Sequence, residues 1–153
     1  MANAPEAISR LWKKLEEARP AVPASVWQVW EAECLGVLDE IVLIVEQNKG
    51  ASIPVKDAEA MGKRAERLQK FVRGIKRSGD GLNALGPDGA ILLEDTIRDL
   101  VAHYLGNDIY KISLIVDVYG AYPQPLPEEN GGLILRNIAA IKAFTNQLKA
   151  RTK

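Results

Sequence analysis

The chain has 153 residues, of which 47% are hydrophobic and 26% charged, a composition typical of one globular domain over residues 1–153 and too apolar for intrinsic disorder. Its 20 basic and 20 acidic side chains cancel, which excludes the strong overall positive charge of an obligate binder of nucleic acids or membrane surfaces. The longest apolar run, residues 41–45, is far shorter than the roughly 20 residues that cross a bilayer, so we expect no transmembrane segment.

The first segment predicts an amphipathic helix that runs to about Ala18. Asn3, Pro5 and Glu6 have the order of a capping box, which satisfies free backbone N–H groups at a helix start. The apolar residues follow at helical spacing: Ile8, Leu11, Trp12 and Leu15. This charged start lacks the apolar block of a signal peptide, and the single cysteine, Cys34, excludes an internal disulfide. We therefore expect a cytoplasmic protein.

Two longer helices follow. Ser25 begins a second candidate capping box, from which helical periodicity runs to about Asn48. Ser52 and Pro54 open the next helix, which ends near residues 78–79. The inner side chains of this helix alternate in steps of four and three, as in antiparallel bundles: Met61, Ala65, Leu68, Val72 and Ile75.

The next stretch predicts a helix from about Pro87 to Leu105 that stops at Gly106–Asn107. Asp108 then caps a short fifth helix over residues 109–119, which is apolar nearly all round and is expected to be central or covered by a partner. The composition of this short segment also fits a buried strand, and periodicity alone leaves both structures open.

The last stretch begins with the proline-rich residues 122–127, which predict an extended connection without regular hydrogen bonds. A final helix starts near Glu128 or Gly132 and has an apolar inner face: Leu133, Ile134, Ile138, Ile141, Phe144 and Leu148. The predicted fold is therefore all-α, a single-domain bundle of five to six mostly antiparallel helices.

The strongest local signal is positive charge between residues 63 and 77, where seven basic side chains and one acidic side chain give a net +6. On a helical wheel Lys63, Lys70 and Arg77 form a stripe opposite the apolar seam, flanked by Arg67 and Arg73. Such a stripe can bind an acidic protein, a phosphate backbone or anionic lipid head groups. The alternative is an ordinary solvated face paired with acids of another helix: Asp39, Glu40 and Glu46.

Aromatic residues offer a second candidate surface. Trp12, Trp27 and Trp30 lie on two adjacent amphipathic helices, and indoles serve both in cores and as anchors at protein interfaces. Trp27 and Trp30 are the binding candidates if they stay exposed, and core packing is the more common alternative. The proline-rich residues 122–127 could dock on an aromatic-lined module, although a stiff connector between helices is the more common use of such a segment and the favoured interpretation.

Candidate chemistry is sparse. Asp95, Asp99 and His103 follow at intervals of four residues along one side of a helix, but metal sites on helices draw further ligands from a second helix and no matching motif exists. Cys34 lies on an apolar helix side near two glutamates, which suits a small buried side chain better than a nucleophile. Asp117 lies within an apolar segment, where a buried carboxylate would need a partner such as Arg136 or Lys111.

No phosphate-binding loop, nucleophile elbow, dinucleotide fingerprint or paired Cys or His cluster occurs in the sequence. We therefore predict no catalytic residue, metal or cofactor. The favoured hypothesis is a non-catalytic interaction module (an adaptor, regulatory or assembly subunit) that binds another protein or a second copy of itself. Nucleic-acid binding through residues 63–77 is the first alternative, and a small-ligand binder or enzyme with an apolar pocket between helices is the second.

Overall fold

The computed structural model describes residues 4–76, 95–121 and 124–153. It contains seven α-helical stretches and two π-helical segments, in this order: α1 (Ala4–Ala18), α2 (Ala24–Trp30), η1 (Glu31–Leu35), α3 (Gly36–Gln47), α4 (Val55–Lys76), α5 (Asp95–Val101), η3 (Ala102–Gly106), α6 (Asn107–Ala121) and α7 (Glu128–Ala150). Because α2, η1 and α3 follow without a break, as do α5, η3 and α6, the described residues form five continuous helices. The predicted all-α fold is confirmed.

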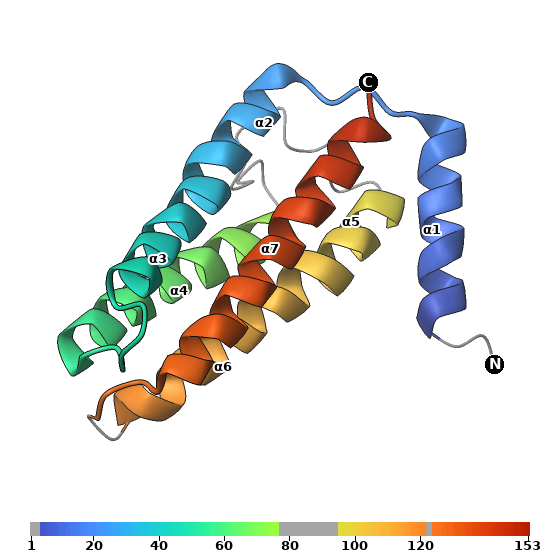
Figure 1. The fold of residues 1–153 in the computed structure, drawn as a ribbon. Coiled ribbons are helices and arrows are strands. Elements are labelled where there is room, and N and C mark those ends of the chain that lie inside the picture. Colours follow the sequence, from blue (N-terminus) through green and yellow to red (C-terminus); the bar gives the residue numbers. More distant parts are fainter. Residues whose placement is uncertain (1–3, 77–94, 122–123) are drawn as a thin grey trace.

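Four of these helices close a ring. α3 packs on α4, α4 on α6, α6 on α7, and α7 returns to α3. Successive helices of the ring run antiparallel, and α1 stands beside α5 at one end of the bundle (Figure 1). The predicted bundle of mostly antiparallel helices is therefore confirmed.

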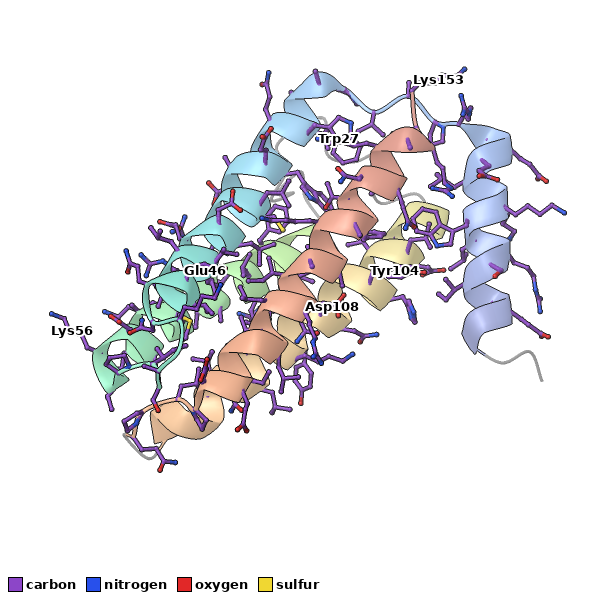
Figure 2. The ribbon with its side chains drawn as sticks, viewed as in Figure 1. Trp27, Glu46, Lys56, Tyr104, Asp108 and Lys153 are labelled. Atoms are coloured by element: carbon purple, nitrogen blue, oxygen red, sulfur yellow. The ribbon has the colours of Figure 1, made fainter. Side chains whose placement is uncertain are left out.

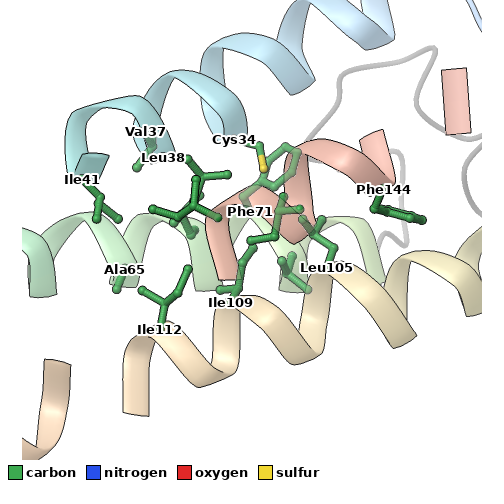
Figure 3. Packing of buried hydrophobic residues seen from close by; sticks show 14 of the residues in the cluster. Cys34, Val37, Leu38, Ile41, Ala65, Phe71, Leu105, Ile109, Ile112 and Phe144 are labelled. Carbon is green, nitrogen blue, oxygen red and sulfur yellow. The ribbon is translucent and has the colours of Figure 1, made fainter. Parts of the chain in front are cut away.

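One connected cluster of buried apolar side chains fills the ring (Figure 3). The inner seam predicted for α4 is part of it, since Met61, Ala65 and Leu68 are each at most 2% exposed. The inner face predicted for α7 is also buried apart from Leu133, which is 44% exposed and whose assignment to the core is wrong. Leu133 lies one residue before the fully buried Ile134, and a step of one residue turns a helical side chain away by about 100°.

The predicted helix end at Gly106–Asn107 is wrong, and so is the predicted cap at Asp108. The chain passes from α5 through η3 into α6, and Asn107 has helical backbone angles, φ −67° and ψ −44°. The π-helical segment adds a residue to the turn and keeps one stripe facing the core across the junction: Val101, Leu105, Ile109, Ile112 and Val116 are all buried. Residues 109–119 are helical, so the strand alternative is wrong as well.

Two local predictions fail for backbone reasons. α2 begins at Ala24 with Pro23 before it and no side-chain cap, so Ser25 lies inside the first turn instead of capping it. In the proline-rich connection, Leu126 and Ile53 exchange two backbone hydrogen bonds of 2.8 Å in an isolated antiparallel bridge. The prediction that this connection makes no regular hydrogen bonds therefore fails at Leu126, which lies between two prolines but has an N–H of its own to donate.

Candidate functional site

The outer side of α4 carries the predicted basic stripe. Its buried seam fixes the rotation of the helix, so that Lys63 and Lys70 point away from the core, with Arg67 and Arg73 beside them. All four side chains are exposed. The fifth predicted member, Arg77, lies outside the described residues.

Part of this stripe is paired with α3, as the alternative interpretation expected. Glu40 lies 3.9 Å from the Arg64 guanidinium and 3.7 Å from that of Arg67. Arg64 also donates to the Ala60 carbonyl over 3.0 Å, while its Nε is buried without a hydrogen-bond partner. Asp39 pairs instead with Lys142 of α7 at 2.6 Å. Arg64 and Arg67 are thus partly neutralised by Glu40.

Three cations remain, and we call Lys63, Lys70 and Arg73 the cationic face of α4. None forms an ion pair with a described residue. Glu59 and Glu66 lie one turn before Lys63 and Lys70 on the same side of the helix, at the spacing of a favourable i,i+4 pair. The charge that this face presents to solvent is therefore smaller than the sequence count of +6.

A shallow groove of about 430 Å³ adjoins the cationic face. Val29 and Phe71 provide its apolar surface, and Glu33, Arg67 and Lys70 provide its charged sides. Phe71 is only 5% exposed and Val29 is half-buried, so side chains of the hydrophobic core form the floor of the groove. Such a surface can hold one apolar side chain of a partner next to acidic groups.

The tryptophans belong mainly to the core. Trp30 is fully buried, and the hypothesis that it contributes to a binding surface is wrong. Trp27 is half-buried, with the Lys149 ammonium 5.4 Å from its ring centroid. Trp12 donates to the Tyr104 hydroxyl over 3.1 Å and holds α1 against the bundle. Of the two predicted aromatic binding residues, only Trp27 is partly exposed. Figure 2 shows Trp27 beside the last turns of α7.

The polar row on α5 does not form a site in the part of the chain that the structure describes. Asp99 is exposed and His103 stacks edge-on against the Tyr104 ring at 4.8 Å, while the Asp95 side chain lies outside the described part. Among the described residues no three His, Cys, Asp or Glu side chains gather closely enough to hold a metal ion. Asp117 is exposed, so the expected buried carboxylate does not exist.

Two titratable groups are perturbed by burial. Desolvation raises the pKa of the fully buried Cys34 thiol to about 12, which suits a small buried side chain and opposes thiolate chemistry. Desolvation also raises the pKa of Asp108 above its usual value of 3.8, an effect that Lys111 and then His103 partly offset.

A second hollow was not predicted from the sequence. It is lined by the turn after α3 and the beginning of α7, two segments that lie near each other in Figure 1. Its volume is about 230 Å³. We call it the α3–α7 hollow, and its walls come from two separate stretches, residues 45–53 and 128–135: Val45, Glu46, Asn48, Lys49, Ala51, Ile53, Glu128, Gly131, Gly132 and Leu135. The two consecutive glycines of α7 were the one signal of this hollow in the sequence. Glycine destabilises the interior of a helix, so two of them together indicate a packing or functional role.

Comparisons with known proteins add no assignment to this geometry. No protein-family model, no curated protein and no solved structure matches the chain. Within the described ranges, none of the helices combines the length and apolarity that a membrane crossing needs.

Proposed function

We propose that the protein is a non-catalytic interaction module that binds another protein through the outer side of α4. The observation that carries this proposal is the cationic face itself: Lys63, Lys70 and Arg73 are exposed on one helix and form no ion pair with a described residue. The buried seam of α4 holds these side chains on a fixed backbone, so binding requires little ordering of the main chain.

The partner surface is acidic and carries an apolar side chain. The three cations would steer an acidic surface toward α4 and set its orientation. The groove between Val29 and Phe71 would then take the apolar side chain, since buried apolar anchors supply most of the affinity at protein interfaces. The lone cysteine supports a cytoplasmic setting for this module.

Nucleic-acid binding through the same face is the second candidate, because phosphates would also pair with Lys63, Lys70 and Arg73. Three acidic side chains oppose it: Glu59 and Glu66 lie on the same side of α4, and Glu33 lies in the adjoining groove. Each of them repels a continuous row of phosphates, whereas a folded partner can place basic or neutral groups opposite them.

Site-specific photo-crosslinking in the source cell tests this function. A benzoylphenylalanine replaces Glu66, between Lys63 and Lys70, and the matched control replaces Glu17, which is exposed on α1. A discrete protein adduct at position 66 that is absent at position 17 supports the proposal. Adducts of RNA or DNA at position 66 support the second candidate, and adducts that are equal at the two positions contradict both.

A further inference from the structure

The α3–α7 hollow has an apolar interior. Val45 and Ile53 are buried beneath it, Leu135 is half-buried at its side, and Ala51 adds a methyl group. An apolar cavity of about 150 Å³ is enough to hold benzene, so a hollow of about 230 Å³ accommodates an aromatic ring with a short chain. The bridge between Ile53 and Leu126 fixes the turn that forms one wall.

The two glycines of α7 serve this hollow differently. A Cβ atom on Gly131 would lie 3.2 Å from Val45 and 3.4 Å from Ile53, so close packing against α3 explains this glycine. A Cβ atom on Gly132 would meet no atom within 4 Å. Packing does not require Gly132, although a glycine lowers helix stability relative to alanine. Because Gly132 lines the hollow, a bulky side chain at this position is expected to narrow it.

The rim of the hollow is rich in hydrogen-bond acceptors. Asn48 uses both protons of its side-chain amide, donating to the Ile44 carbonyl over 2.9 Å and to Asp57 over 3.0 Å. Its amide oxygen therefore faces no donor among the described residues. The carboxylates of Glu46 and Glu128 form no ion pair with a described residue.

Charge on the rim favours a cationic ligand. Glu46 and Glu128 supply two negative charges, and Lys49 supplies one positive charge. Glu46 also lies in the last turn of α3, where the carbonyl end of the helix adds partial negative charge. The opposite dipole at the beginning of α7 is offset by the two glutamates of its first turn, Glu128 and Glu129.

We propose that the α3–α7 hollow binds a small organic amine with an apolar body. The body lies against Val45, Ile53 and Leu135, and the ammonium group donates to the carboxylates of Glu46 and Glu128 and to the amide oxygen of Asn48. This site uses none of the side chains of the cationic face, so it stands independently of the function proposed for α4.

An NMR titration of the ¹⁵N-labelled full chain with phenethylamine tests the site. Saturable shifts centred on the amides of Asn48, Gly131 and Gly132 are expected, with a dissociation constant on the order of millimolar for a ligand of this size. Phenethyl alcohol, which lacks the charge, and 3-phenylpropionate, which reverses it, are expected to bind at least about fivefold more weakly. Equal or tighter binding of either compound, or diffuse shifts without saturation, would overturn the proposal.

Variants of the rim and wall sharpen the test. The double variant Glu46→Gln, Glu128→Gln is expected to weaken phenethylamine binding about tenfold and leave phenethyl alcohol unaffected. Glu129→Gln removes one negative charge at the residue next to Glu128, outside the lining of the hollow, and is the control for a general loss of charge. Gly132→Leu is expected to abolish binding, and a thermal melt checks that it remains folded. Unchanged phenethylamine affinity in the double glutamine variant, whose changed residues are exposed, contradicts the site whether or not Gly132→Leu folds.

Discussion

The indole N–H of Trp30 donates a hydrogen bond to the Thr145 hydroxyl across the core, over 3.1 Å. Thr145 in turn donates to the Ile141 carbonyl over 2.9 Å, so both polar groups are satisfied although both residues are at most 1% exposed. The Trp30 ring also meets Phe71 edge-on at 5.8 Å. The hydrogen bond joins α2 to α7, and the ring contact joins α2 to α4. Together they explain why Trp30 belongs to the core and not to a surface.

Replacing Thr145 by valine is expected to destabilise the fold by about 1 to 3 kcal/mol, because the shape is kept while the buried Trp30 N–H loses its acceptor. Urea unfolding followed by tryptophan fluorescence measures the change. Thr145→Ser keeps the hydroxyl and is the control, with a smaller loss from the missing methyl group. Equal destabilisation by the two variants would show that the hydrogen bond contributes little.

Cys34 is expected to resist alkylation in the folded protein. Its thiol is fully buried and burial raises its pKa to about 12, so almost no thiolate forms at pH 8. Iodoacetamide labelling followed by mass spectrometry should show slow modification of the folded protein, limited by the rate at which the structure opens around Cys34. Protein unfolded in urea should be modified rapidly. Rapid labelling of the folded protein at pH 8 would contradict the buried position.

Asp108 makes stability depend on pH. Because its pKa is raised in the folded state, folded protein binds the proton more tightly than unfolded protein, and stability is lost as pH rises from below 3.8 through the raised pKa. Asp108→Asn is therefore expected to be more stable than the wild type near neutral pH, with the difference vanishing below pH 3.8. Thermal melts across this range measure the effect, and the exposed Asp117→Asn is the control.

Trp12 is expected to hold α1 on the bundle. Its ring lies 5.7 Å from Tyr104 and 5.9 Å from Phe144, and the Arg151 guanidinium covers it at 4.9 Å. Trp12→Ala removes these contacts and is expected to lower the free energy of unfolding by about 3 to 5 kcal/mol at most. The loss is smaller if α1 detaches while the rest of the bundle stays folded. Hydrogen exchange should rise over residues 6–18 and stay unchanged in α4. The exposed Lys13→Ala is the control, and equal exchange in the two variants would argue against this role.

Features that depend on residues close together in the sequence could be predicted, and features that depend on packing between helices could not. The α4 seam of Met61, Ala65 and Leu68 repeats within one helix, so its period identified both the helix and its buried side. The junction at Gly106 was missed because glycine followed by asparagine is typical of helix ends, while the buried stripe that continues through the π-helical segment depends on packing against α4 and α7.

The surfaces were only partly predictable for the same reason. The helical wheel correctly predicted that Lys63 and Lys70 of α4 point outward. Pairing of the basic stripe with acids was foreseen as an alternative, and among the described residues Glu40 is the one predicted acid that forms it. The α3–α7 hollow brings together side chains more than 80 positions apart in the sequence. No local pattern encodes such a meeting, and only the assembled bundle reveals it.

Affinity purification of charge-reversed protein from the source cell, after nuclease treatment, tests the central claim most directly. The variant Lys63→Glu, Lys70→Glu, Arg73→Glu reverses the cationic face, and Arg10→Glu, Lys13→Glu, Lys14→Glu makes the same change on exposed residues of α1. We predict that a protein recovered with the wild type and with the α1 control is lost from the α4 variant. Equal recovery with both variants would contradict a binding role for α4.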